Sequence, residues 1–226
     1  MNYAQPFPGV PCITYGLQNM MHTDAMFDNN NVLIPRPASF WLEFSNAEKM
    51  LFGQTHNIYL FPTIELITEL EQIIDGRSAI EICAGNGGIS GALGIPGTDS
   101  KNLNDTNENC SSFTFGSHVE KCEASLAVAK YKPKVVIGAW VDHLYDPKRH
   151  DLGGHTVGVD EHHIISEVDE YILIGNTSVH RKSPLLEDLH SCQIKTHRIM
   201  TYFVGTEMLQ SRSRCGLNFM LRLTRK

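Results

Sequence analysis

The sequence lacks a paired-cysteine motif, although it contains six cysteines in 226 residues. No two cysteines have the Cys-x-x-Cys spacing of zinc knuckles and thioredoxin-type redox sites. The pattern therefore argues against both kinds of site. Cys83 lies in an apolar run, and we expect it to be a buried strand residue, not a nucleophile.

Long apolar runs and an excess of basic residues are also absent. No segment approaches the roughly 20 apolar residues that span a bilayer, and residues 1–20 lack the basic start and apolar core of a signal peptide. We therefore expect a cytoplasmic protein with free thiols and no membrane partner. The net charge of −6 argues against broad, non-specific binding to nucleic acid, which needs a dense cationic surface.

The most informative segment that is present is an apolar run ending in glycines, at residues 79–88. We expect a strand at residues 79–83, a turn at Gly85 and Gly87, a short helix, and a second strand at residues 94–98. Glycine lets a ligand approach the backbone where a Cβ would clash. Asp99, after the second strand, can bind the hydroxyls of a ribose. This order predicts a site for an adenosine-type cofactor.

The spacing of the motif disfavours a nicotinamide-dependent oxidoreductase. A dinucleotide site has Gly-x-Gly-x-x-Gly with its acidic residue about 20 positions further on. Here Gly91 lies one position late for the third glycine, and Asp99 follows Gly85 by only 14 positions.

The segment resembles motif I of the class I S-adenosylmethionine-dependent methyltransferases, with Glu81 ahead of Ala84-Gly-Asn-Gly87. The resemblance implies S-adenosylmethionine as the cofactor. Glu81 would help to place its methionine part, the turn of Ala84, Gly85, Asn86 and Gly87 would accommodate it, and Asp99 would take the ribose.

Later segments follow the order of the same family, so that the resemblance covers roughly residues 60–176. Residues 119–124 resemble the third-strand segment that meets the adenine, with Glu123 where Asp is more usual. Residues 132–140, which include the cofactor-side Gly138, resemble strand four, and residues 170–176 resemble strand five. The implied fold is α/β and Rossmann-like. It has a mostly parallel seven-stranded sheet, whose last strands lie at residues 196–204 and 217–223, with an antiparallel C-terminal strand.

Two regions are expected from composition. Residues 1–57 contain five prolines and an apolar group around Trp41, which predicts an N-terminal extension that packs over the core and covers part of the cleft; the alternative is a purely structural cap. Residues 58–226 would form the cofactor-binding domain. Within it we expect an amphipathic helix at 62–74, an irregular segment at 100–112, and a helix at 161–168 capped by Asp160.

Residues that follow strands four and five are candidates for chemistry, since ligands of open α/β sheets lie beyond the carboxyl ends of the strands. Trp140 and Asn176 are candidates for binding the acceptor, and Asp142, His143 and His180 for general-base catalysis. The alternatives remain core packing for Trp140, an exposed loop histidine at 143, and a turn with a surface histidine at 176–180.

The methyl acceptor is expected to be a small molecule more than a nucleic acid. DNA amino-methyltransferases of this fold carry Asp/Asn-Pro-Pro-aromatic after strand four, where this chain has Gly138-Ala-Trp-Val-Asp-His143. No metal is expected, since the adjacent His162 and His163 point to different helix faces. A non-catalytic S-adenosylmethionine-binding or regulatory module of the same fold is the alternative function. The sequence leaves the oligomeric state open.

Overall fold

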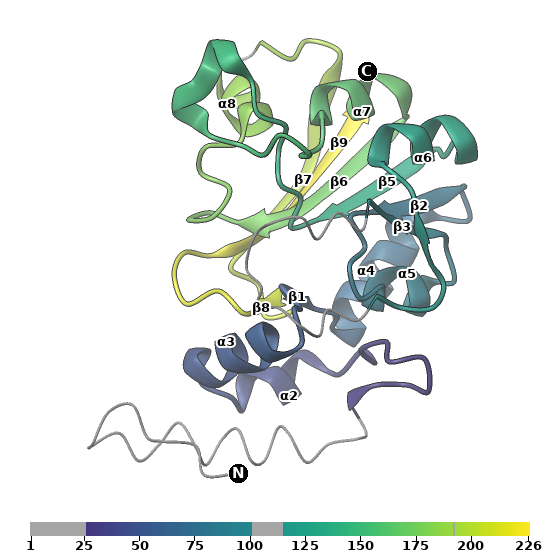
Figure 1. Cartoon of the computed structure of the whole chain (residues 1–226), viewed down its shortest axis with the longest axis vertical. Coiled ribbons are helices and arrows are strands. Elements are labelled where there is room, and N and C mark those ends of the chain that lie inside the picture. Colours follow the sequence, from purple (N-terminus) through teal and green to yellow (C-terminus); the bar gives the residue numbers. More distant parts are fainter. Residues whose placement is uncertain (1–25, 101–114, 192) are drawn as a thin grey trace.

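A computed structural model describes residues 26–100, 115–191 and 193–226. The described chain forms a seven-stranded sheet in the order β4-β3-β2-β5-β6-β9-β7, with helices on both faces (Figure 1). Its strands are β2 (Ala79–Ile82), β3 (Gly97–Asp99), β4 (Val119–Lys121), β5 (Val135–Ala139), β6 (Glu170–Asn176), β7 (His197–Val204) and β9 (Asn218–Arg225). A separate two-stranded sheet pairs β1 (Leu60–Phe61) with β8 (Gln210–Ser211).

The expected sheet is confirmed, including its single antiparallel member. The five neighbouring strands β4, β3, β2, β5 and β6 run parallel to one another. Strand β9 runs antiparallel between β6 and β7. The second strand of the motif begins at Gly97, three residues later than predicted. Gly94, with φ of 64°, ends the preceding helix, and Pro96 has no N–H to donate to a ladder.

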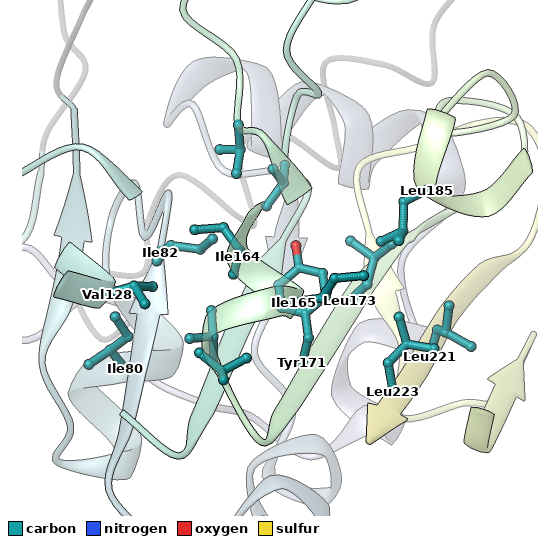
Figure 2. Packing of buried hydrophobic residues seen from close by; sticks show 14 of the residues in the cluster. Ile80, Ile82, Val128, Ile164, Ile165, Tyr171, Leu173, Leu185, Leu221 and Leu223 are labelled. Atoms are coloured by element: carbon teal, nitrogen blue, oxygen red, sulfur yellow. The ribbon is translucent and has the colours of Figure 1, made fainter. Parts of the chain in front are cut away.

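Helices cover the two faces of the sheet because successive strand residues point to opposite sides. Ile80 and Ile82 of β2 face one layer, where they pack with residues of α6, α7 and α8 (Figure 2). Ala79 faces the other layer, with α4 and α5. The helices are α2 (Ala38–Leu42), α3 (Asn46–Thr55), α4 (Ile64–Ile74), α5 (Gly88–Leu93), α6 (Ala124–Tyr131), α7 (Glu161–Glu167), α8 (Pro184–His190) and the 3₁₀ helix η2 (Pro147–Leu152).

Helix α4 begins two residues later than predicted. Thr63 is its N-cap, since its Oγ1 accepts a hydrogen bond from the Leu66 N–H at 3.0 Å. Pro62 therefore precedes the cap instead of occupying the first turn. The amphipathic pattern is confirmed, since Leu66, Leu70 and Ile73 are buried, while Ile64 in the first turn is 48% exposed.

The described part of the N-terminal region packs through aromatic side chains. Trp41 is fully buried and stacks on Phe61, with ring centroids 4.2 Å apart and planes 11° apart. Met26, Leu33, Phe52 and Ile58 complete this cluster. Because it includes residues on both sides of residue 57, packing alone marks no boundary there, and the division of the chain at that point stays a prediction.

Two further expectations concern the limits of the described chain. Residues 101–112 of the expected irregular segment lie outside the described residues. Within the described ranges, no helix combines the length and apolarity needed to cross a membrane.

The expected helix after the polar loop is confirmed as α7, and the Asp160 carboxylate accepts a hydrogen bond from the His163 N–H at 3.0 Å.

Candidate active site

A cavity of about 320 Å³ opens where β2, β3 and β5 end. Carboxyl ends of parallel strands meet at one edge of a sheet, so segments far apart in sequence converge there. The volume lies in the range of small-molecule sites. Among the residues predicted for the site, the lining includes Glu81, Ala84, Gly85, Asn86, Gly87, Asp99, Trp140, Asp142 and His180.

The glycine turn after β2 has a backbone that only small residues accommodate. Gly87 has φ of 80°, and a Cβ there would lie 2.6 Å from Val119 Cγ2 and 2.7 Å from the His118 ring. The turn is closed by a hydrogen bond from the Gly87 N–H to the Ala84 carbonyl at 2.7 Å. Cys83 precedes the turn, just beyond β2, with φ of 54°. Burial raises the pKa of its thiol, so the sulfur is a poor nucleophile.

Asp99 ends β3 with its carboxylate directed at the glycine turn. Its Oδ2 accepts a hydrogen bond from the Gly85 N–H at 3.0 Å, and the residue lines the cavity. The backbone of the glycine turn, which has no side chain at Gly85, and the Asp99 carboxylate therefore lie side by side. The arrangement suits a ligand with paired hydroxyl groups, because a carboxylate accepts several hydrogen bonds.

Glu81 is 3% exposed and lines the inner part of the same cavity. Its Oε2 accepts a hydrogen bond from the Ser90 N–H in the first turn of α5 at 2.8 Å. Burial raises the pKa of Glu81 to about 7, and nearby Asp99 adds to this, while the hydrogen bonds from Ser90 act in the opposite direction. A cationic ligand group would favour the ionised form.

Asn86 joins the glycine turn to the N-terminal region, a role that the sequence did not predict. Its Oδ1 accepts a hydrogen bond from the Leu33 N–H at 2.7 Å, and its Nδ2 donates to the Asn31 carbonyl at 2.7 Å. Leu33 and Tyr59 then line the cavity. The side chain of Asn86 therefore holds one wall of the site against the turn.

Asn86→Ala is expected to lower the free energy of unfolding by about 2 kcal/mol, because it leaves the Leu33 N–H and the Asn31 carbonyl without these partners. Urea unfolding measures the change. Asn29→Ala, at an exposed position of the nearby turn, is the matched control and should unfold like the wild type. Equal stability of the two variants would contradict the role given to Asn86.

Trp140 directly follows β5 and lines the cavity. Its φ of 58° turns the chain away from the sheet, and its N–H donates to the Ile174 carbonyl at 2.8 Å. The indole ring lies 5.8 Å from the ring of Tyr59 and 5.4 Å, edge to face, from that of His180. Asp142 is exposed at this wall, and its carbonyl accepts a hydrogen bond from the Val159 N–H at 2.8 Å.

His180 is 8% exposed, and its Nδ1 is engaged by backbone. The Asn176 N–H donates to this nitrogen at 2.9 Å. The Asn176 carbonyl lies 3.2 Å from the same nitrogen but already accepts a hydrogen bond from the His180 N–H at 2.9 Å. Burial lowers the pKa of His180. The neutral ring therefore carries its proton on Nε2, where it is a hydrogen-bond donor and not the base expected from the sequence.

Four residues predicted for the site do not line this cavity. Gly138 makes room for a packed side chain, since a Cβ there would lie 2.5 Å from Tyr171 Oη. Glu123 is the N-cap residue of α6 and contributes no side-chain cap. Neither is part of the described cavity lining, and their roles toward the cofactor stay predictions.

The other two lie beside the cavity but are turned away from it. Asn176 is 1% exposed; its Oδ1 accepts from the Ser178 N–H at 2.9 Å and its Nδ2 donates to Asn218 at 3.0 Å. His143 lines a second cavity of about 280 Å³ behind the loop. Asn176 therefore stabilises a turn through these hydrogen bonds. The neighbouring residues 142 and 143 line different cavities, on opposite sides of the segment that follows β5.

A second buried carboxylate, Glu161, was not predicted for the site. It accepts a hydrogen bond from Tyr171 Oη at 2.9 Å and one from Ser183 Oγ at 3.4 Å. Burial raises the pKa of Glu161 to about 7, against the hydrogen bonds from those two hydroxyls. An acidic residue in the first turn of a helix is common, so its sequence position gave no signal of burial.

Glu161 is expected to make stability fall as pH rises. A folded-state pKa of about 7 against an ordinary 4.5 contributes stability that is fully present below pH 4.5 and lost as pH rises through 7. Glu161→Gln should therefore gain roughly 3 kcal/mol relative to the wild type between about pH 4 and 8. Urea unfolding across this range measures it. Glu167→Gln, exposed on the same helix, should show no such trend; a pH-independent difference for Glu161→Gln would contradict the assignment.

Within the described ranges, no group of three or more His, Cys, Asp or Glu side chains is arranged to hold a metal ion. His162 Nε2 instead lies 2.9 Å from Asp188 Oδ2, which also accepts from Arg149.

No family model and no curated protein matches the chain. Among solved structures, it matches a putative class I S-adenosylmethionine-dependent methyltransferase from Listeria monocytogenes at 13% identity, over 82% of this chain and 70% of that one, with a TM-score of 0.49. Magnesium protoporphyrin IX methyltransferase from Synechocystis, with bound S-adenosylmethionine, matches at 14% identity over 80% and 84%, with a TM-score of 0.42.

A tRNA (uracil-54, C5)-methyltransferase from Pyrococcus abyssi, in complex with S-adenosylhomocysteine, matches at 11% identity over 73% of this chain, with a TM-score of 0.41. This chain spans only 40% of that protein. The sheet is the Rossmann-like one that the resemblance implied, since β9 runs antiparallel between β6 and β7 in an otherwise parallel sheet.

Proposed function

We propose that this chain is an S-adenosylmethionine-dependent methyltransferase that acts on a small molecule. The observation that carries the proposal is the hydrogen bond from the Gly85 N–H to Asp99 Oδ2, which fixes a carboxylate beside a bare glycine turn in the cavity. Fold alone would not support an activity, so the proposal depends on this site.

The residues present fit the cofactor by their chemistry. S-adenosylmethionine supplies a methyl group already activated on a sulfonium. Asp99 would accept hydrogen bonds from the ribose hydroxyls, and Glu81, poised between its two protonation states near pH 7, would pair with the ammonium group. The turn at Gly85 and Gly87 would leave room for the part of the cofactor between its ribose and its ammonium group. The protein then has to orient the acceptor and exclude water.

A small molecule is favoured by the size and charge of the site. The volume of about 320 Å³ is that of a small-molecule pocket. The described lining contains three carboxylates, Glu81, Asp99 and Asp142, and no lysine or arginine. Recognition of nucleic acid depends on cationic contacts to phosphates, which this part of the cavity does not supply.

Calorimetric titration with S-adenosylhomocysteine tests the cofactor, with NAD as the competing ligand. We expect binding of the former and none of the latter; the reverse result would overturn the proposal. Incubation with methyl-labelled cofactor and pools of small molecules then tests transfer. Cofactor binding without turnover by any pool would favour the non-catalytic binding module instead.

A further inference from the structure

One wall of the cavity is formed by the rings of Tyr59, Trp140 and His180. The guanidinium of Arg212 lies over the Tyr59 ring at 3.5 Å from its centroid, and its Nη1 also donates to the Gly53 carbonyl at 3.2 Å. Tyr59 in turn contacts Trp140, and Trp140 contacts His180. Each ring is thus held by its neighbour. Val157 and Val179, 55% and 54% exposed, flank this wall at the mouth of the cavity.

Asp142 differs from the other two carboxylates of the cavity. Glu81 and Asp99 each accept a hydrogen bond from a backbone N–H. Asp142 is exposed, and its carboxylate neither accepts a hydrogen bond nor forms an ion pair within the described part of the chain. Burial lowers the pKa of His180, which lines the same cavity, although the charge of Asp142 acts on that pKa in the opposite direction.

A ligand that covers this wall must provide a hydrogen-bond or ion-pair partner for the Asp142 carboxylate. A carboxylate that loses water without gaining a partner is costly to bury. An anionic ligand would add repulsion, and an alcohol would offer only one neutral hydrogen bond. An ammonium group offers a charge-assisted hydrogen bond to the carboxylate, and it is attracted by the adjacent Trp140 ring.

We propose, on the basis of the function proposed above, that the methyl acceptor is a compact amine with an apolar body, which binds as its ammonium ion between Asp142 and the ring of Trp140. Val157 and Val179 contact the apolar body, and His180 Nε2 donates to any electronegative atom of it. In the transfer, the ammonium first gives a proton to Asp142 or water. The nitrogen lone pair then bonds to the methyl carbon, and the sulfur keeps the electrons of the broken C–S bond.

Binding of matched probes to the full-length chain, without cofactor, tests the proposal. The probes are 2-phenylethylamine, 2-phenylethanol and 3-phenylpropanoate, which share a phenyl ring and differ in charge. We expect the amine to bind at least about 10-fold more tightly than the alcohol, and the carboxylate to bind least, as measured by calorimetry.

Substitutions test whether the preference for the amine comes from Asp142. Asp142→Asn should reduce amine affinity about 10-fold and leave S-adenosylhomocysteine affinity unchanged. Asp151→Asn, at an exposed acid of the same loop, should change neither. If the alcohol or the carboxylate binds as well as the amine, this inference is overturned while the cofactor titration still stands. If the amine preference holds but S-adenosylhomocysteine does not bind, the ammonium site stands and the proposed methyltransferase function falls.

Discussion

Asp99→Ala is expected to weaken S-adenosylhomocysteine binding by about 100-fold. A hydrogen bond to a charged group contributes roughly 1.5–3 kcal/mol, and two ribose hydroxyls would lose their acceptor together. The substitution also removes the partner of the Gly85 N–H, so the turn keeps its backbone hydrogen bond from the Ala84 N–H to the Thr98 carbonyl but loses this second contact with β3. Calorimetric titration of the purified variant measures the loss.

Two variants separate the role of Asp99 in binding from its role in structure. Asp99→Asn keeps an oxygen that accepts from the Gly85 N–H but removes the charge, so we expect a smaller loss of about 10-fold. Glu123→Ala removes the acid that the family resemblance assigned to the adenine, and affinity should not change, because Glu123 does not line the cavity. If Glu123→Ala weakens binding more than Asp99→Ala, the cofactor lies elsewhere.

The glycine turn and Asp99 were predictable because their signal is local. An apolar run ending at Ile82, a glycine turn and a short helix specify a strand, a turn and a helix through residues that contact each other within a few positions. The parallel pairing of β2 with β3 then follows from the short connection, and it brings Asp99 to Gly85. The start of β3 moved where glycine and proline restrict the backbone, and the last strand, β9, extends to Arg225, two residues further than predicted.

The contacts of Asn86 were not predictable from the sequence. The hydrogen bond that joins it to Leu33 spans 53 positions, and no short-range pattern marks either partner. The pairing of β1 with β8 joins strands of only two residues, which are too short to show a period of two. Helix α8 did have a signal, Ser183 followed by Pro184 at the first position, which the sequence interpretation did not use.

The direction of side chains in the loop after β5 was also beyond the sequence. Asp142 and His143 are neighbours, and in an extended segment successive side chains point to opposite sides. The bridge between His143 and Val159 fixes which of them faces the cavity. Both were candidates for catalysis from sequence, yet only Asp142 lines the proposed acceptor wall.

The sheet that supports this site depends on one buried carboxylate. Glu170, the first residue of β6, is 1% exposed and pairs with two arginines. Arg77 Nη2, from the segment after α4, lies 2.7 Å from Glu170 Oε2, and Arg222 of β9 contacts both oxygens. One side chain thereby links a helix end to two neighbouring strands.

Glu170→Ala is expected to lower the free energy of unfolding by about 3 kcal/mol, because it leaves two close guanidinium groups without their shared counter-charge. We expect the lower part of the range for broken buried pairs, since Arg77 and Arg222 are 34% and 25% exposed and keep some hydration. Urea unfolding followed by circular dichroism measures the change. The slope with denaturant should stay the same, which indicates that the folded state is intact.

Asp169→Ala is the matched control for Glu170→Ala. Asp169 precedes Glu170, and its carboxylate pairs with Lys134 at 3.0 Å where both side chains are about half exposed. Exposed pairs contribute 1 kcal/mol or less, so this variant should stay close to the wild type. If the two variants lose the same stability, the burial of Glu170 is not what makes its pairing important, and β6 must be held to β9 by packing and backbone hydrogen bonds alone.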